Sequence, residues 1–391
     1  IIVALSLIFA YFVTYNFVEP KAYDYMTKHV MAENLPFDTH KQVYGSDDVI
    51  LVVIDSNTVE KYRWPWKREV NCKIFEYFKY SQPKLIIYDA ILATLDKDNP
   101  NSDKAFFKTL SSFDNLIAGF MPAITPWENP QEGKLYDKAF ASKYSIPVEE
   151  KSSTRPILFE SMMKFPKPYF DVIKNTGSVS MVPGFINGNL SAWGMDEIYR
   201  NHEYLIKYTE VFYPSMAMKA FLMLNNNPRT VLTDKTLKFP ELKYDIKQRK
   251  TVYGQTLTAT KYYKLYNTGY SHIRYSAVDV MDSYDAISQG KKPVLSPEIF
   301  KDKIILIGAN VPAGTGLNDN KNTPITVNHP GVDIQATAID NILNRDFLKI
   351  VPDGLNALLT ILGMLLVYGF IRVSNLSKSI TSTTVILISY L

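Results

Sequence analysis

The run VILVVID at residues 49–55 consists of six consecutive apolar residues followed by an aspartate. Three other short runs share this apolar character: LIIYD at 85–89, LIAGF at 116–120 and IILIG at 304–308. Strands that are apolar on both sides are typical of a parallel sheet covered on both faces. The four runs therefore predict a buried parallel sheet, closed by a strand that comes late in the chain.

Amphipathic helices are predicted next to these runs, because apolar residues recur there at helical spacing. We also expect Ser102 to be the N-cap of the second helix. Strand–helix–strand alternation predicts an α/β fold with a mostly parallel, Rossmann-like three-layer sheet. The marking residues are Val70, Ile74 and Phe78 after the first run, Phe106, Leu110 and Phe113 after the second, and Val332, Ala336 and Ile339 after the last.

The middle of the chain follows a different pattern. Residues 121–175 are rich in Pro, Lys, Ser and Glu and lack a clear period, so we interpret them as a long insertion in the domain. Alternating apolar and polar residues at 177–212 and a tyrosine-rich stretch at 235–275 predict antiparallel additions to the sheet. Because the last core strand follows these segments, residues 37–350 are expected to form one domain.

Apolar runs flank this domain on both sides. Residues 1–18 carry no charge and are long enough to span a bilayer, which takes about 17–25 residues. Two further runs, at 354–372 and 379–391, predict transmembrane helices, the last one cut by the end of the chain. We interpret 1–18 as an uncleaved signal anchor, with a cleaved signal peptide as the alternative. Residues 19–36 are expected to continue the first span as a juxtamembrane stalk helix.

The orientation follows from the short loop between the last two apolar runs. This loop carries Arg372 and Lys378, and short cationic loops prefer the cytoplasm. The large domain is therefore predicted to lie outside the membrane. The alternative, that the apolar runs are buried core helices, fits poorly with their positions near both ends of the chain.

Several classes of function find no support in the composition. The net charge is only +4 and Lys and Arg do not cluster, so no nucleic-acid partner is expected. The single cysteine, Cys72, excludes an internal disulfide and a cysteine zinc site. The five histidines include no i,i+4 pair, so we predict no metal site. Neither G-x-S-x-G nor HExxH occurs, and we predict no catalytic residue and no cofactor.

A set of short motifs occurs along the chain: WPWKR at 64–68, YPSMA at 213–217, YSAVDV at 275–280, KIILIG at 303–308, TP at 323–324 and PGVDIQA at 330–336. In combination these motifs resemble a known family, the type-two CHASE extracellular sensor domain of bacterial receptors. The resemblance covers about residues 20–345. One position departs from the family, because Asp196 and Glu197 stand where members often have Asp-Gly ahead of an arginine.

The resemblance implies a receptor of the bacterial inner membrane with a periplasmic sensor domain. Family members carry one transmembrane helix before the sensor and two or three after it. Their cytoplasmic output is an adenylate or guanylate cyclase, which we expect first, or a kinase, which we expect next. The implied partners are the lipid bilayer, an unknown small-molecule or protein ligand, and a second copy of the chain or other components of a membrane complex.

Candidate ligand-binding residues lie where the predicted parallel strands end. Ligands of open α/β sheets bind beyond the carboxyl ends of the strands, where Asp55, Asp89 and Gly308 are found. Arg68 follows the first strand, and an Asp–Arg–Asp cluster there would hold a charged ligand. The alternative is that Arg68 forms an internal ion pair that only fixes the loop.

Two aromatic residues and one loop complete the candidate site. Trp64 and Trp66 would form an aromatic wall for a ligand, or would instead fill the core beneath the loop. The glycine-rich segment 308–316, which includes Asn310, would hold an anion through backbone N–H groups. It lacks the Gly-Lys-Ser/Thr end of a P-loop. Asp319 and Thr323 are expected at the rim of this loop.

Two other functions remain open on the sequence alone. The tyrosine-rich stretches favour a structural or assembly protein of the cell envelope, since tyrosine is enriched at protein interfaces. The second alternative function is that of an extracytoplasmic enzyme built on a Rossmann-like scaffold, because a fold does not determine a function.

Overall fold

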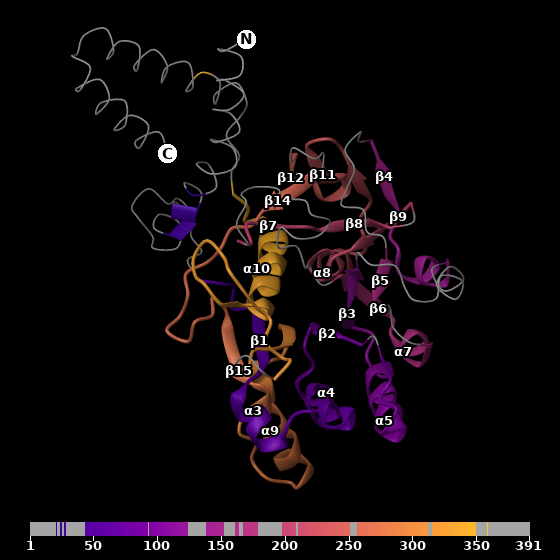
Figure 1. Cartoon of the computed structure of the whole chain (residues 1–391), viewed down its shortest axis with the longest axis vertical. Coiled ribbons are helices and arrows are strands. Elements are labelled where there is room, and N and C mark those ends of the chain that lie inside the picture. The colour runs from indigo at the N-terminus through magenta and orange to yellow at the C-terminus, as the bar shows by residue number, and fades with distance from the viewer. Residues whose placement is uncertain are drawn as a thin grey trace, which may run out of the picture.

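The structure is a computed structural model and is shown in Figure 1. It describes residues 21, 24–25, 27–28, 44–92, 94–123, 138–151, 161–163, 167–178, 198–208, 210–250, 256–311, 315–348 and 358.

A seven-stranded sheet forms the centre of the molecule, with the order β15-β1-β16-β2-β3 and with β6 and β5 both paired to β3. All of its pairings are parallel except that of β3 with β5. The predicted α/β class and mostly parallel sheet are thereby confirmed. The strands are β1 (Val49–Ile54), β2 (Leu85–Ile91), β3 (Leu116–Ala123), β5 (Ser161–Met163), β6 (Asn175–Ser178), β15 (Ile273–Ser276) and β16 (Ile304–Ala309).

The continuous apolar runs reflect burial on both faces. In β1, Ile50 and Val52 belong to one hydrophobic core, whereas Leu51 and Val53 belong to a second core on the opposite face. Successive side chains of a strand point to opposite faces, so a strand between two cores needs apolar residues at every position.

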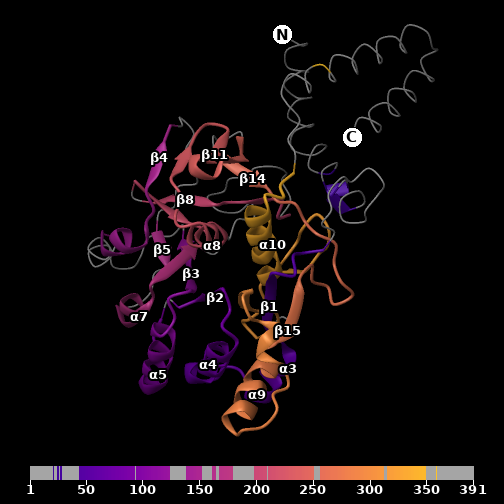
Figure 2. The ribbon, with the colours of Figure 1, turned by 180° about the vertical axis from the view of Figure 1, so that it is seen from behind.

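Helices cover both faces and give the predicted three layers (Figures 1 and 2). The first face is packed against α4, α5 and α9, and the second against α8 and α10. Ser102 is not the N-cap of α5, because that helix begins at Pro100 and Ser102 accepts a hydrogen bond from the Glu69 N–H instead. The helices are α3 (Ser56–Tyr62), α4 (Cys72–Ser81), α5 (Pro100–Ser111), α7 (Lys167–Val172), α8 (Met216–Leu224), α9 (Ala277–Ser288) and α10 (Gly331–Asn344), with 3-10 turns at Arg68–Asn71, Pro240–Leu242 and Pro297–Ile299.

Smaller sheets confirm the predicted antiparallel additions, although β10 and β4 pair in parallel. Most of these strands lie at the end of the molecule opposite to α3 and α9 (Figure 1). They are β4 (Val148–Glu150) with β10 (Thr230–Leu232), β11 (Thr236–Phe239) and β12 (Tyr244–Lys247); β7 (Asn201–His202) with β14 (Thr256–Ala259) and β13 (Arg249–Lys250); β8 (Leu205–Tyr208) with β9 (Val211–Pro214); and β17 (Asn320–Lys321) with β18 (His329–Pro330).

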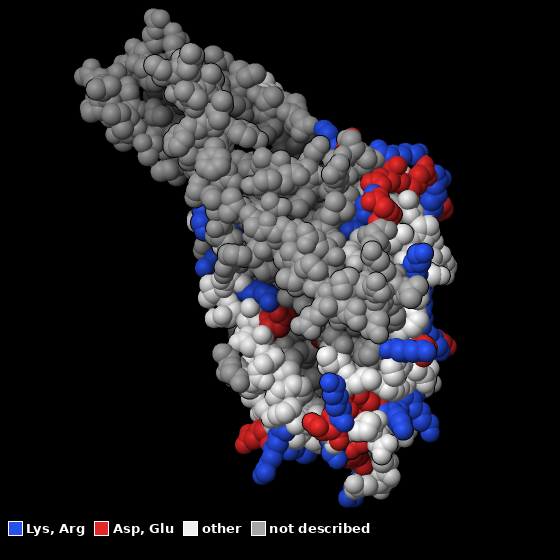
Figure 3. All heavy atoms as spheres, turned by 45° about the vertical axis from the view of Figure 1, so that its right-hand side comes forward, with Lys and Arg blue, Asp and Glu red and all other residues white. Residues whose placement is uncertain are grey.

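The surface carries charges of both signs. Figure 3 shows Lys and Arg interspersed with Asp and Glu on the face that it presents. Ion pairs such as Lys73–Asp285 join α4 to α9 with both side chains about one-third exposed. Such pairs are typical of a solvated surface and add little to stability.

The predicted membrane spans at 1–18, 354–372 and 379–391 lie outside the described residues, apart from residue 358. Within the ranges that the structure describes, no helix combines the length and apolarity needed to cross a bilayer. The spans therefore stay predictions, as does most of the stalk helix at 19–36.

Candidate functional site

The carboxyl ends of β1, β16 and β2 meet at one edge of the sheet, because the three strands are parallel neighbours. Asp55 follows β1, Asn310 follows β16 and Asp89 lies in the last part of β2. We call these three residues, together with Arg274, Tyr270, Asp319 and Lys321, the carboxyl-edge cluster. In Figure 1 this edge is the one at which α3 begins.

Asp55 has a structural role at this edge. Its carboxylate caps α3 by accepting the Thr58 N–H at 3.1 Å, and it also accepts the Ser276 hydroxyl at 2.8 Å. A guanidinium nitrogen of Arg274 lies 3.6 Å away. Asp55 therefore connects β1 to β15 through contacts within the protein, and these contacts account for the residue without a ligand.

Arg274 is an incompletely satisfied cation that no sequence pattern had marked as a candidate. Its Nε atom is buried and makes no hydrogen bond to any residue that the structure describes. Its guanidinium stacks over the Tyr270 ring at 5.0 Å, and the Tyr270 hydroxyl accepts a 2.6 Å hydrogen bond from the Asn310 amide. The predicted residues Asp55 and Asn310 are thus connected through Arg274 and Tyr270, which were not predicted as site residues.

Asp89 is the predicted residue with the most unusual electrostatics. It is half-buried, and its carboxylate has no hydrogen-bond or ion-pair partner among the described residues. Burial, with a smaller effect from the Asp319 carboxylate, raises the pKa of Asp89 to about 7, although Lys321 opposes the shift. Lys321 instead pairs with Asp319 at 2.7 Å. A carboxyl with such a pKa is poised to gain or lose a proton, which is typical of functional sites.

Gly308 allows α10 to approach the sheet at this edge. A Cβ atom on Gly308 would lie 2.7 Å from the Val332 Cγ2 atom, closer than real contacts permit. The glycine is therefore required by helix packing, and no role in anion binding is needed to explain it.

Arg68 does not meet Asp55 or Asp89 but forms an internal ion pair. It donates to Asp103 at 2.8 Å and stacks over the Tyr169 ring at 5.5 Å. Asp103 is buried and also accepts the Tyr169 hydroxyl at 3.1 Å. This arrangement matches the alternative in which Arg68 fixes the loop.

The two tryptophans form an edge-to-face pair with ring centroids 4.9 Å apart, and the Trp64–Pro65 peptide bond is cis. Trp66 packs partly into the first core and donates its indole N–H to Asn71. Trp64 is 38% exposed. Trp66 therefore fills part of the core beneath the loop, as in the second of the two interpretations, whereas the Trp64 ring remains exposed at the surface.

Thr323 lies in an internal turn. Its hydroxyl donates to the Thr326 carbonyl and hydrogen-bonds the His329 ring, each at 3.1 Å, and the residue is buried. It is not part of the carboxyl-edge cluster.

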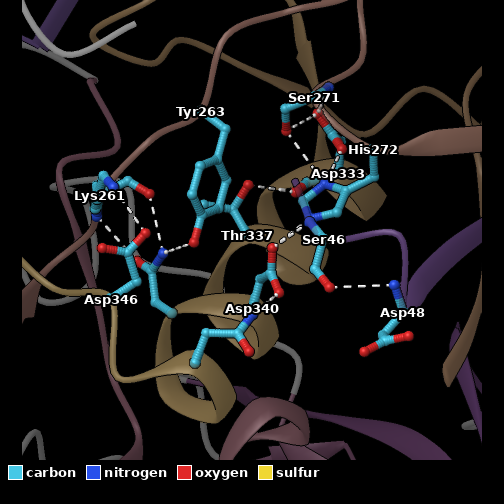
Figure 4. A network of polar contacts seen from close by, with 12 residues as sticks. Ser46, Asp48, Lys261, Tyr263, Ser271, His272, Asp333, Thr337, Asp340 and Asp346 are labelled. Atoms are coloured by element: carbon cyan, nitrogen blue, oxygen red, sulfur yellow. Dashed lines mark hydrogen bonds and ion pairs between the residues drawn. The ribbon is translucent and has the colours of Figure 1, made fainter. Parts of the chain in front are cut away.

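A buried polar network escaped the sequence patterns because its members are far apart in the chain (Figure 4). The Asp333 carboxylate contacts His272 Nδ1 and His329 Nε2, each at 2.7 Å, and accepts the Ser271 N–H and hydroxyl. Among the described residues, no His, Cys, Asp and Glu group is arranged to hold a metal ion. The one available signal was Asp333 itself, an acidic residue on the apolar face of a buried helix.

Buried cations hold both ends of the described domain. Arg200 is fully buried and donates Nε and an NH₂ group to the Asp24 carboxylate at 2.7 and 2.6 Å. Lys261 is equally buried and contacts Asp346, just beyond α10, at 2.7 Å. Residues next to the predicted spans are thereby bonded directly to the domain.

The tyrosine-rich stretch is largely internal. Tyr262, Tyr263 and Tyr270 are each at least 95% buried. Their rings therefore do not supply the exposed interface on which the assembly interpretation depended.

One comparison with known proteins gives a match. The family model of the CHASE2 domain matches residues 1–370. No curated protein and no solved structure matches the chain.

Proposed function

The chain belongs to the CHASE2 domain family of extracellular sensor modules in signalling receptors, and from this premise we propose that it is the sensor part of a receptor in the bacterial inner membrane. The observation that carries the proposal is the bonding of both ends of the domain to buried cations, Asp24 to Arg200 and Asp346 to Lys261. A change in the domain would reach both tethers through these contacts. The expected output domain is an adenylate or guanylate cyclase, with a kinase next.

The carboxyl-edge cluster is the proposed ligand site. Two observations support it: the Asp89 carboxylate has no hydrogen-bond or ion-pair partner among the described residues, and the buried Nε atom of Arg274 makes no hydrogen bond to any of them. Polar groups left without partners in a folded protein are costly, so they indicate an interaction still to be made. A small polar ligand, or a loop of a partner protein, would supply it.

The placement of the domain is testable by labelling with a membrane-impermeant maleimide. On a Cys72→Ser background, Lys104→Cys on the exposed side of α5 should react in intact cells. Ser377→Cys, in the short loop between the last two apolar runs, should react only after lysis. The reverse pattern would contradict the proposed topology.

The ligand site is testable by thermal unfolding of the detergent-solubilised chain with a panel of amino acids, polyamines and dicarboxylates. A ligand at a hundredfold excess over its Kd stabilises by about 2.7 kcal/mol. Asp89→Asn should abolish that stabilisation, whereas Asp114→Asn, on the exposed Lys174–Asp114 pair, should retain it. A compound that stabilises the wild type and the Asp89→Asn protein equally would show that this cluster is not its site.

A further inference from the structure

The part of the carboxyl-edge cluster around Asp89 carries more negative than positive charge. Asp89 is half-buried and lies close enough to Asp319 and Lys321 for the charges of both to act on its carboxylate. The Lys321 ammonium is bonded to Asp319 at 2.7 Å, so it is already matched by one carboxylate. The carboxylate of Asp89 has no hydrogen-bond or ion-pair partner among the described residues. One positive charge is therefore missing beside Asp89 whenever this residue is ionised.

The other side of the cluster, at β1 and β15, does not supply that charge. The Arg274 guanidinium lies 3.6 Å from Asp55, and burial together with the Asp55 carboxylate raises the pKa of Asp279 on α9. The nearby Lys61 ammonium is bonded to Asp282. Among the described residues at this edge, the carboxylates thus outnumber the remaining cations; the carboxylates are Asp55, Asp89, Asp279 and Asp319, and the cations are Arg274 and Lys321.

A carboxylate held away from water without a counter-charge is costly, because a protein interior screens charge poorly. Arg274 has the opposite need, since its buried Nε–H finds no acceptor among the described residues. We propose that the ligand of the carboxyl-edge cluster is a protonated amine, which donates its N–H groups to Asp89 and carries an oxygen that accepts the Arg274 Nε–H. This assignment rests on the proposed ligand site and specifies what binds there.

An amine fits these groups better than a metal ion or an anion does. Calcium takes six to eight oxygen ligands, whereas Asp89 and Asp319 are two carboxylates, one of them already bonded to Lys321. No set of three His, Cys, Asp or Glu side chains suited to a metal was found in the described part of the chain. An ammonium group is compact and has three donors, so two carboxylates can satisfy it. A dicarboxylate would add to the negative excess.

The proton of Asp89 competes with the amine for the same carboxylate. Burial, and then the Asp319 charge, raises the pKa of Asp89 to about 7 against the opposing effect of Lys321. The amine binds the ionised carboxylate, so its affinity should be nearly complete at pH 8 and lost as the pH falls through 7. The ionised fraction drops from about nine-tenths at pH 8 to about one-tenth at pH 6, which corresponds to a roughly tenfold loss of affinity.

Methylammonium is the smallest probe of this inference. Tetramethylammonium is the matched control, because it has the same charge but no N–H donor. Thermal unfolding of the detergent-solubilised full chain is followed in mixtures of the two chlorides at a constant total concentration, which keeps the ionic strength constant. A ligand of two non-hydrogen atoms reaches a Kd on the order of 10 mM at best. The Tm should rise saturably with the methylammonium share at pH 8, and the apparent Kd should be about tenfold weaker at pH 6.

Three derivatives of one skeleton test the charge and the acceptor separately. β-Alaninamide carries an ammonium and a neutral oxygen, β-alanine adds a carboxylate, and N-acetyl-β-alanine is an anion without the ammonium. At pH 8 the amide should bind more tightly than methylammonium and β-alanine, and the N-acetyl compound should not shift the Tm. Arg274→Lys keeps a positive charge but removes the Nε donor, so it should abolish the advantage of the amide over methylammonium.

Asp89→Asn should abolish the effect of methylammonium, whereas Asp114→Asn, on the exposed pair with Lys174, should retain it. Equal effects of the two ammonium ions in the wild type, or a stronger methylammonium effect at pH 6 than at pH 8, would overturn the inference without any variant. If N-acetyl-β-alanine stabilised the wild type but not Asp89→Asn, the site would stand and only its assignment to amines would fall. Methylammonium binding that is unchanged in Asp89→Asn would count against the cluster as the ligand site itself.

Discussion

At the scale of single residues, buried ion pairs fix the loops around the sheet. Asp103 is one example, since it accepts hydrogen bonds from Arg68, Tyr169 and the Asp96 N–H at 2.8, 3.1 and 2.7 Å. Three segments of the chain therefore depend on one carboxylate.

Removing that carboxylate should be costly. Asp103→Ala leaves Arg68 half-buried beside apolar groups, and breaking a buried pair costs about 3–5 kcal/mol. We expect a loss on the order of 3 kcal/mol in the free energy of unfolding by urea, given that Arg68 keeps some contact with water. Asp114→Ala on the exposed Lys174 pair is the control and should cost less than about 1 kcal/mol. Equal losses would refute the assigned role.

Gly308 offers a second test at this scale. Gly308→Ala forces a methyl group against Val332 and should destabilise by about 1–3 kcal/mol, the usual cost of overpacking. The double variant Gly308→Ala/Val332→Ala should lose less than the sum of the single losses, because the second change makes room for the first. Additive losses in urea unfolding would show that the clash is absorbed elsewhere.

At the scale of secondary-structure elements, the buried helix α10 contributes both to the second hydrophobic core and to the buried polar network around Asp333. Its 14 residues include apolar contacts to the second core through Val332 and Ile339. They also include the buried carboxylates Asp333 and Asp340. The charge state of this helix should therefore appear in the stability of the whole domain.

The pH dependence of stability is predicted from His272. Its folded pKa of about 9 lies above the unfolded value of about 6.5, so the stabilisation is complete below pH 6.5 and is lost as the pH rises to about 9. The difference corresponds to on the order of 3 kcal/mol. His272 and His329 hold the pKa of Asp333 below its usual range despite burial, so that contribution is lost only in acid.

Urea unfolding at pH 6 and pH 9.5 measures this effect. The stability gap between the wild type and His272→Gln should be widest at pH 6 and should largely close by pH 9.5. His202→Gln should differ from the wild type by a constant amount over the same range. A constant gap for His272→Gln would mean that the imidazole is not charged in the folded state.

The sequence predicted the core strands that have continuous apolar runs, the amphipathic helices and the antiparallel additions, but it did not predict that β6 and β15 join the central sheet. β1, β2, β3 and β16 were found because burial on both faces requires apolar residues throughout. β15 reads IRYS and β6 reads NTGS, and neither run is long or apolar enough to indicate a strand buried in the central sheet. Sheet order was also out of reach, since local patterns do not encode which distant strands pair.

The same reason explains how much of the site could be predicted. Asp55 and Asp89 were selected from the rule that ligands bind beyond the carboxyl ends of parallel strands, and Asn310 was selected because it lies in the glycine-rich loop that follows one of these strands. Arg274 and Tyr270 reach this edge only because β15 pairs with β1, a contact between distant segments. Asp103 as the partner of Arg68 and Asp333 as the partner of two histidines were hidden in the same way.

At the scale of the whole molecule, the two ends of the domain are held by separate buried pairs. The Asp24–Arg200 pair is bidentate, with both distances below 2.8 Å, which is the strong geometry for such contacts. A tether bonded in this way moves with the domain and not independently of it.

Weakening this pair should loosen the tether and leave the sheet intact. In Asp24→Asn, amide exchange of residues 21–28 should speed up at least tenfold, while β1 keeps its protection. Lys28→Ala, on an exposed residue of the same segment, is the control and should have no effect. Unchanged exchange in Asp24→Asn would show that the tether is held by other contacts.

The position of β16 has a consequence for how the polypeptide reaches its native state. This strand fills the gap between β1 and β2, although about two-thirds of the domain is synthesised between β2 and it. Until the ribosome has delivered Ile304–Ala309, β1 and β2 each have an open side where a permanent neighbour will later bind. Long-range pairing of this kind slows folding and leaves unfinished strand edges open to wrong partners. The nascent chain would therefore depend on chaperones for most of its synthesis, and shortened versions ending before this strand would have no native form of their own.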